Sequence, residues 1–154
     1  LMISDPAKYI DSFCQAGADI LTVHAEACSD LKTVLRQIKG HKVRAGVTIN
    51  PDKDIELFLP HLSDIDQVLI MTVYAGFGGQ KFMTEMLPRI KKVCEEIKKH
   101  LHIIDLQVDG GINRETAALC ARNGANVFVS GSYIFSSGNY CTSIRAIREA
   151  AKSV

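Results

Sequence analysis

Helical and strand patterns alternate along the whole chain, and every strand pattern ends in polar or glycine residues. Apolar runs predict strands at residues 19–24, 43–49, 67–73, 103–109 and 126–130. Apolar residues at helical spacing predict helices near residues 6–16, 31–40, 51–59, 86–97, 114–122 and 144–151. This order is typical of a parallel α/β fold, and it leaves an open doubly wound sheet and a closed barrel as near equals.

The charge balance of the chain excludes some classes of binding partner. The net charge of +1 supplies no broad attraction to nucleic acid or to an anionic membrane, so we expect neither as a partner. No apolar run approaches the ~20 residues that span a bilayer, and no signal-peptide pattern is recognisable, so we expect a cytoplasmic protein. Five cysteines without a Cys-x-x-Cys pair indicate reduced thiols.

The segment Ala75-Gly-Phe-Gly-Gly-Gln80 lies between an apolar strand pattern and a long helix pattern. Glycine allows backbone N–H groups to approach an anion closely, and a phosphate is the natural guest of such a turn. The segment lacks the Gly-Lys-Ser/Thr ending of a nucleotide P-loop and the spacing of dinucleotide-binding turns. The alternative is a glycine-rich turn that binds nothing.

Two further glycine turns follow the next two predicted strands. Asp109-Gly-Gly-Ile-Asn113 follows one, and Gly131-Ser132 follows the other. Phosphate cups in barrels are frequently built from the last strand-to-helix loops, so three successive turns of this kind favour a phosphate site over purely structural turns.

Two titratable residues end predicted strands and could face the same mouth. His24 and Asp109 are candidates for metal ligands or proton-transfer groups. The alternatives are a hydrogen-bonded structural histidine and a turn-forming aspartate. Met71, on an apolar strand pattern, is by default a core residue.

Together these blocks resemble the ribulose-phosphate 3-epimerase family. The resemblance is carried by Leu1-Met-Ile3 with Pro6, Ala16-Gly-Ala-Asp19 leading to His24-Ala-Glu26, Met71-Thr-Val73 with Gly76-Phe-Gly-Gly-Gln-Lys-Phe82, Val108-Asp-Gly-Gly-Ile-Asn113, and Gly131-Ser132 before Ile134-Phe135. It implies a (β/α)₈ TIM barrel, of which residues 1–154 would form a single partial domain without the first strands. It also implies an isomerase that interconverts D-ribulose 5-phosphate and D-xylulose 5-phosphate at C3 through an enediolate.

The resemblance also implies roles for individual residues. A divalent ion (zinc, iron, manganese or cobalt) would be held by two histidines and two aspartates, which His24 and Asp109 match in part. Asp109 would also be one acid/base. The substrate, a ketopentose phosphate, would contact Gly76, Phe77, Gly78, Gly79, Gly110, Gly111, Gly131 and Ser132, with Met71 and Met2 in the apolar wall. A homo-oligomer is expected.

The chain departs from the family pattern in two places. Tyr74-Ala75 stands where the family usually has a polar or acidic residue followed by proline. The family's early His-x-Asp-x-Met-Asp strand, which supplies the other histidine and aspartate, has no counterpart. We therefore expect the natural protein to be longer. If the 154 residues act alone, we expect weak metal binding and no epimerase turnover.

Three alternative functions remain open at this point. An allulose-6-phosphate 3-epimerase-like enzyme would use the same metal chemistry on another ketose phosphate. A phosphate-binding barrel enzyme without metal, of the thiamine-phosphate synthase type, is a second alternative. The third is a catalytically inactive fragment that binds sugar phosphate.

Overall fold

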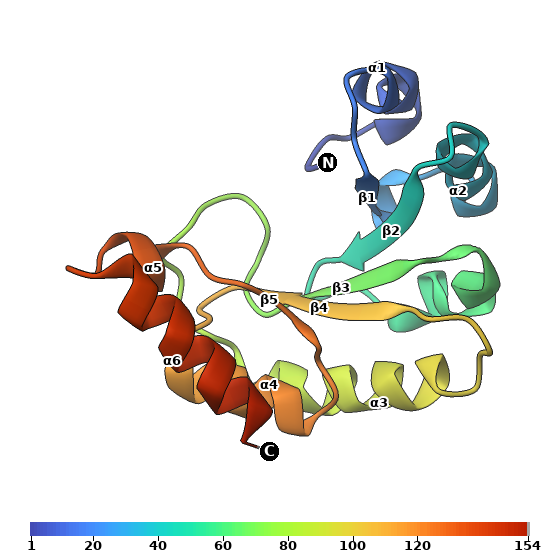
Figure 1. Ribbon diagram of the computed structural model, residues 1–154. Coiled ribbons are helices and arrows are strands. Elements are labelled where there is room, and N and C mark those ends of the chain that lie inside the picture. Colours follow the sequence, from blue (N-terminus) through green and yellow to red (C-terminus); the bar gives the residue numbers. More distant parts are fainter. Residues whose placement is uncertain (154) are drawn as a thin grey trace.

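A computed structural model describes residues 1–153 and contains one sheet of five parallel strands. The strands are β1 (Ile20–His24), β2 (Arg44–Ile49), β3 (Gln67–Met71), β4 (Asp105–Asp109) and β5 (Val127–Val129). Their order in the sheet is their order in the chain, and the sheet curves (Figure 1). A doubly wound sheet reverses its strand order partway, whereas a barrel does not. The strand order therefore indicates an arc of a barrel.

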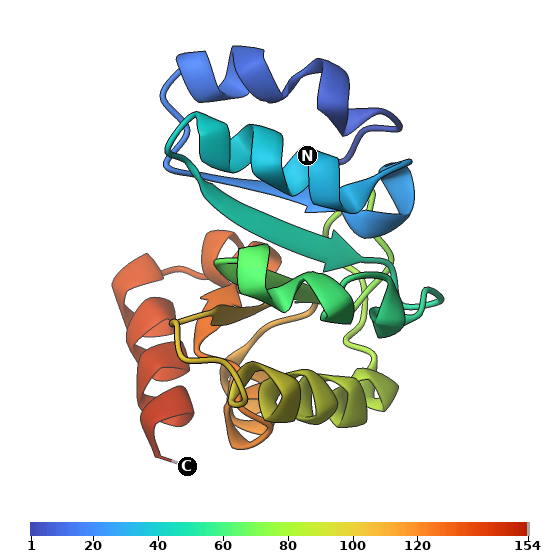
Figure 2. The same ribbon diagram turned by 90° about the vertical axis from the view of Figure 1, so that its right-hand side faces the viewer.

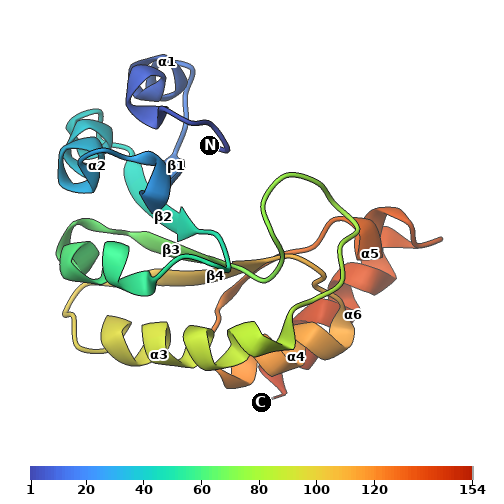
Figure 3. The same cartoon turned by 180° about the vertical axis from the view of Figure 1, so that it is seen from behind.

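The helices lie on the outer, convex side of this arc, as Figures 1 and 3 show. They are α1 (Ile10–Gln15), α2 (Leu31–Gly40), α3 (Leu87–Ile97), α4 (Arg114–Arg122), α5 (Ser132–Phe135) and α6 (Tyr140–Lys152). Polar side chains cap three of them: Asp30 accepts from Thr33 N, Asn113 forms a capping box with Thr116, and Asn139 accepts from Thr142 N. Figure 2 shows the N-terminal helices and the C-terminal helix at opposite ends of the sheet.

Two predicted helices differ from the structure. The predicted helix 6–16 is interrupted at Tyr9, between a 3₁₀ turn (η1, Pro6–Lys8) and α1. The predicted helix 51–59 is wrong: this segment forms 3₁₀ turns, η3 (Ile55–Leu57) and η4 (Leu59–Asp64). Asp54 is extended (φ −84°, ψ 135°) and its side chain accepts from Glu56 N, so no α-helix runs continuously from residue 51 to residue 59. Short turns η2 (Ala25–Ala27) and η5 (Thr84–Met86) were not predicted.

The two faces of the sheet have different chemistry. Side chains in register across the outer face are aliphatic and form the main core with the helices: Val23, Val47, Ile49, Val68, Ile70, Leu106 and Val108. The inner face carries Thr22, His24, Thr48, Gln67, Gln107 and Asp109 in register with Leu69 and Met71. Burial of the outer face drives folding, while the inner face presents polar groups to the concave side.

β3 is buried at all of its positions, as its almost wholly apolar sequence predicts. Its inner-face residues Leu69 and Met71 form a separate small cluster with Val73. Within the described residues, no helix combines the length and the apolar character that a membrane span requires.

Candidate active site

A cavity of about 270 Å³ lies at the carboxyl ends of β3, β4 and β5. Its lining contains eleven of the twelve site residues predicted from sequence: Met2, Met71, Gly76, Phe77, Gly78, Gly79, Asp109, Gly110, Gly111, Gly131 and Ser132. All three predicted glycine turns therefore meet at one site. The missing member of the predicted set is His24.

The side chain of Thr72 supports the turn after β4. The hydroxyl of Thr72 donates to the backbone carbonyls of Asp109 at 2.9 Å and Gly110 at 2.6 Å. Gly110 has φ +125°, and a Cβ there would lie 2.6 Å from a methyl carbon of Val73. Such a position requires glycine on both conformational and steric grounds. This turn fixes the backbone from which the Asp109 side chain projects.

The loop after β3 is closed by one side chain. Gln80 Nε2 donates to the carbonyls of Tyr74 at 2.7 Å and Phe77 at 2.8 Å. Within the loop, Gly76 has φ +141° and Gly79 has φ +78°, which side-chain-bearing residues rarely adopt. The loop's shape therefore depends on both its glycines and Gln80.

Asp109 provides the only carboxylate among the described residues that line the cavity. It is partly buried, and loss of hydration raises the pKa of its carboxyl above the usual value. A raised pKa brings a carboxyl closer to the neutral range, where a group that both takes up and returns a proton works best. The site thus combines one carboxylate suited to proton transfer with three glycine turns suited to an anion.

His24 lies in a neighbouring cavity of about 320 Å³, beside Glu26 and Asn50. Met2 and Gly76 line both cavities, whereas Asp109 does not line this one. His24 is buried, and its Nδ1 lies 3.1 Å from Glu26 Oε1. The structure therefore does not bring His24 and Asp109 into one cavity.

The predicted metal site requires several ligand side chains close together. Among the described residues, no group of three or more His, Cys, Asp or Glu side chains could hold an ion. His24 ends β1 and Asp109 ends β4, with β2 and β3 between them. These residues do not fit a complete metal site, which would need further ligands.

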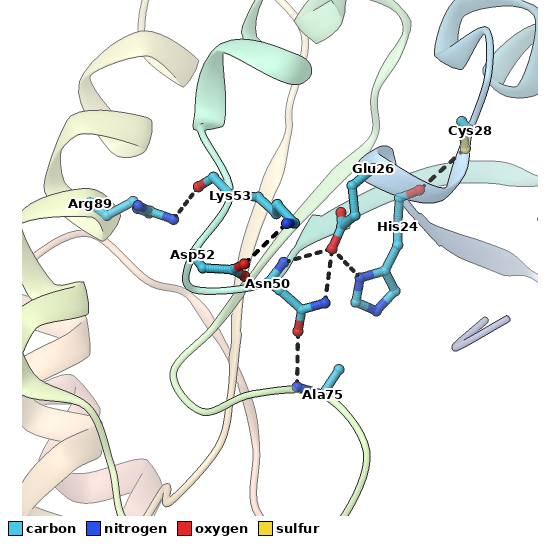
Figure 4. A network of polar contacts seen from close by, with 8 residues as sticks. All are labelled: His24, Glu26, Cys28, Asn50, Asp52, Lys53, Ala75 and Arg89. Atoms are coloured by element: carbon cyan, nitrogen blue, oxygen red, sulfur yellow. Dashed lines mark hydrogen bonds and ion pairs between the residues drawn. The ribbon is translucent and has the colours of Figure 1, made fainter. Parts of the chain in front are cut away.

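Sequence reasoning gave no role to the polar network around Asn50 (Figure 4). Asn50 joins Glu26 to the backbone N–H of Ala75, at the start of the glycine loop. Both Glu26 and Asn50 follow predicted strands, which was the available signal. Tyr74 and Gln80 also line the main cavity.

A larger cavity of about 550 Å³ lies between β5 and α6, and none of the residues within 1–153 that line it has a carboxylate. Its lining is mainly aliphatic, with Ile134, Ile144 and Ile147, so it lacks the groups that proton transfer requires. The smaller cavity around Asp109 is therefore the candidate active site.

Comparisons of sequence show the family of the chain. The sequence profile of the ribulose-phosphate 3 epimerase family matches residues 1–135. The chain is 46% identical to the ribulose-phosphate 3-epimerase of Bacillus subtilis, covering 96% of this chain and 69% of that protein. The enzyme of the same name from Eremothecium gossypii is 37% identical over 90% of this chain, which corresponds to 56% of its own length. The chain thus spans between about half and about two thirds of these relatives.

Comparisons of structure agree on the fold. KGPDC from Streptococcus mutans superposes with a TM-score of 0.71 at 19% identity, covering 96% of this chain and 67% of that one. The 3-hexulose-6-phosphate synthase from Salmonella typhimurium gives a TM-score of 0.67 at 20% identity, covering 96% and 68%. Such neighbours are TIM-barrel enzymes, which confirms the predicted α/β barrel class.

Proposed function

Since the chain belongs to the ribulose-phosphate 3-epimerase family, we propose that it supplies the phosphate grip and one proton-transfer group of a pentose-phosphate 3-epimerase. The proposed substrates are D-ribulose 5-phosphate and D-xylulose 5-phosphate. The proposal depends above all on one observation: Asp109 and the three glycine turns line the same cavity.

The chemistry follows from the acidity of a C–H bond next to a ketone. When Asp109 removes the C3 proton, negative charge develops on the enediolate oxygens, and the proton returns to the same carbon. Inversion requires a second acid on the opposite face. Asp109 is the only carboxylate of the cavity within residues 1–153, so this chain provides half of the proton-transfer pair.

The glycine turns would hold the phosphate away from the reacting carbon. Binding energy from a remote, non-reacting group helps to orient the reacting centre, so the turns would raise the rate as well as the affinity. Met71 and Met2 would form an apolar wall that excludes water.

We also propose a divalent ion, of which this chain would supply only some of the ligands. The ion would be zinc, iron, manganese or cobalt. The sharing of one ion by His24 and Asp109 stays a prediction that the cavity lining does not favour. Cytoplasmic location, a homo-oligomeric state and a single partial domain over residues 1–154 also stay predictions.

A chimera tests the proposal. The part of the Bacillus subtilis relative that this chain does not cover is joined to residues 1–154, and epimerisation at C3 is followed by NMR in D₂O. We expect turnover of D-ribulose 5-phosphate, with deuterium entering at C3, and weaker turnover of allulose 6-phosphate. The chain alone should bind inorganic phosphate but should not epimerise.

The variant Asp109→Asn in the chimera tests the role of the carboxylate. Asparagine keeps the size of the side chain but cannot take up a proton, so the rate of epimerisation at C3 should fall by at least about a hundredfold. The dissociation constant for inorganic phosphate should change by less than about threefold, since the glycine turns remain. Epimerisation at the wild-type rate in the variant chimera would contradict the role of Asp109.

A further inference from the structure

Asn50 makes hydrogen bonds to two different segments of the chain. Figure 4 shows its position between Glu26, which follows β1, and Ala75 of the glycine loop. Its backbone N and side-chain Nδ2 donate to Glu26 Oε1 at 3.0 Å and 2.9 Å. Its Oδ1 accepts from the backbone N–H of Ala75 at 3.0 Å. One side chain therefore connects the segment after β1 to the first residue of the loop.

The anchor of this connection is a carboxylate oxygen. Glu26 Oε1 accepts hydrogen bonds from both nitrogens of Asn50 and also contacts His24 Nδ1 at 3.1 Å. Hydrogen bonds to an ionised acceptor are roughly twice as strong as neutral ones. Asn50 is thus held in one orientation, with Oδ1 directed at the loop.

The connection to Asn50 differs from the other restraints on the loop. Gln80 binds two carbonyls inside the loop, so it sets the loop's shape but not its place. After the loop, Met83 N donates to Thr72 O at 2.9 Å, which ties the exit to the end of β3. The bond from Ala75 to Asn50 ties the entrance to β2 instead.

We propose that Asn50 is a positioning residue, which holds the entrance of the glycine loop so that Gly76 to Gly79 keep a phosphate-accepting shape. The inference rests on the proposed function, because it assumes that this loop grips phosphate. It also depends on residue 75 having an N–H group. Proline at this position would have none and would remove the connection.

The test compares Asn50→Ala, Ala75→Pro, Ala75→Ser and the double variant of the first two, all in the full chain. Two quantities are measured by NMR: the heteronuclear NOE of the Gly76, Gly78 and Gly79 amides without ligand, and the dissociation constant for inorganic phosphate. Ala75→Ser keeps the N–H donor and is the matched control. Ala75→Pro leaves the Asn50–Glu26 bonds intact and fixes φ at the loop entrance, so the double variant shows whether Asn50 acts through residue 75 or only through Glu26.

We expect Asn50→Ala to lower the glycine NOE values and to raise the phosphate dissociation constant about tenfold, the size expected for one lost hydrogen bond. Ala75→Pro also removes this bond, but the proline ring fixes φ at the loop entrance, so its NOE values and its dissociation constant should stay close to those of the wild type. The double variant should match Ala75→Pro, because no bond between residues 50 and 75 is left for Asn50→Ala to remove. Ala75→Ser should behave as wild type.

An unchanged loop in Asn50→Ala, or a double variant that binds phosphate as weakly as Asn50→Ala, would overturn the proposal. If the wild-type chain does not bind phosphate at these glycines, the proposed function fails instead. The NOE values without ligand still test the positioning role in that case, so the two failures are distinguishable.

Discussion

Thr72 and Gly110 are joined by a buried hydrogen bond of 2.6 Å from the threonine hydroxyl to the glycine carbonyl. The same hydroxyl lies 2.9 Å from the carbonyl of Asp109, so one side chain after β3 supports the turn that carries the candidate proton-transfer group. Thr72 is fully buried, and nothing from solvent can replace its hydroxyl. The position of Asp109 therefore depends on the neighbouring strand.

Replacing Thr72 by valine tests this dependence. Valine has the same shape but no hydroxyl, so the Gly110 carbonyl would lose its donor in a buried place. We expect the free energy of unfolding to fall by about 1–3 kcal/mol in urea denaturation. Thr72→Ser keeps the hydroxyl and removes one methyl group, at a cost of about 1 kcal/mol. Equal losses in the two variants would show that packing, not the hydrogen bond, supports the turn.

Most of the fold and of the main cavity could be predicted from local pattern. Residues after parallel strands converge at one edge, so the spacing alone placed Asp109 and the glycine turns together. His24 also ends a strand, but the pattern does not say how far apart two strands lie in the sheet. The three strand steps from β1 to β4 were therefore not foreseeable from spacing.

The hydrogen-bond network was beyond sequence reasoning for a related reason. Glu26, Asn50 and Ala75 follow the neighbouring strands β1, β2 and β3, but the spacing of the sequence does not say which donor meets which acceptor. Likewise, the apolar spacing of residues 51–59 fits a helix, yet Asp54 is extended and binds Glu56 N with its side chain, which interrupts the helical hydrogen bonding.

Gly111 should tolerate no side chain. Its φ is +62°, and a Cβ there would lie 2.6 Å from the backbone nitrogen of Phe82, which cannot move aside as a flexible side chain could. We expect Gly111→Ala to lower the free energy of unfolding by about 1–3 kcal/mol, from strain at this backbone conformation. It should also weaken phosphate binding, since Gly111 lines the cavity.

Gly40→Ala is the matched control for that prediction. A Cβ at Gly40 meets nothing within 4 Å, and the residue ends α2 without a positive φ. The free energy of unfolding of Gly40→Ala should stay within about 1 kcal/mol of the wild-type value, and phosphate binding should be unchanged. A control as unstable as Gly111→Ala would mean that the loss reflects glycine replacement in general.

At the edge of the sheet where the strands begin, the same reciprocal pair of hydrogen bonds, here called a joint, occurs twice. Asp66 N donates to the Ala45 carbonyl at 2.8 Å, while Ala45 N donates to Asp66 Oδ2, also at 2.8 Å. Asn126 and Leu106 repeat this reciprocal pair at 2.9 Å and 2.7 Å. In each joint, a side chain just before one strand completes the hydrogen bonding of its neighbour.

Asp66→Ala should therefore cost about 1–3 kcal/mol of unfolding free energy, because it leaves the Ala45 N–H without its acceptor. Asp66→Asn keeps an acceptor oxygen and loses only the ion pair with Lys39, which measures 3.5 Å and is partly exposed. Such a pair contributes less than about 1 kcal/mol. Thermal or urea denaturation of both variants checks this, and a larger loss in Asp66→Asn would indicate that charge dominates the joint.

Cys120 should be the slowest cysteine to react with a thiol reagent. It is fully buried on α4, and burial raises the pKa of its thiol to about 12, so almost no reactive thiolate exists near pH 8. Cys141 is exposed at the start of α6 and should supply the fastest phase of labelling. In a Cys141→Ser variant that phase should disappear, while Cys120 reacts only as urea unfolds the chain, at the rate of global opening. Rapid native labelling of Cys120, located by mass spectrometry, would mean that α4 opens away from the sheet without global unfolding.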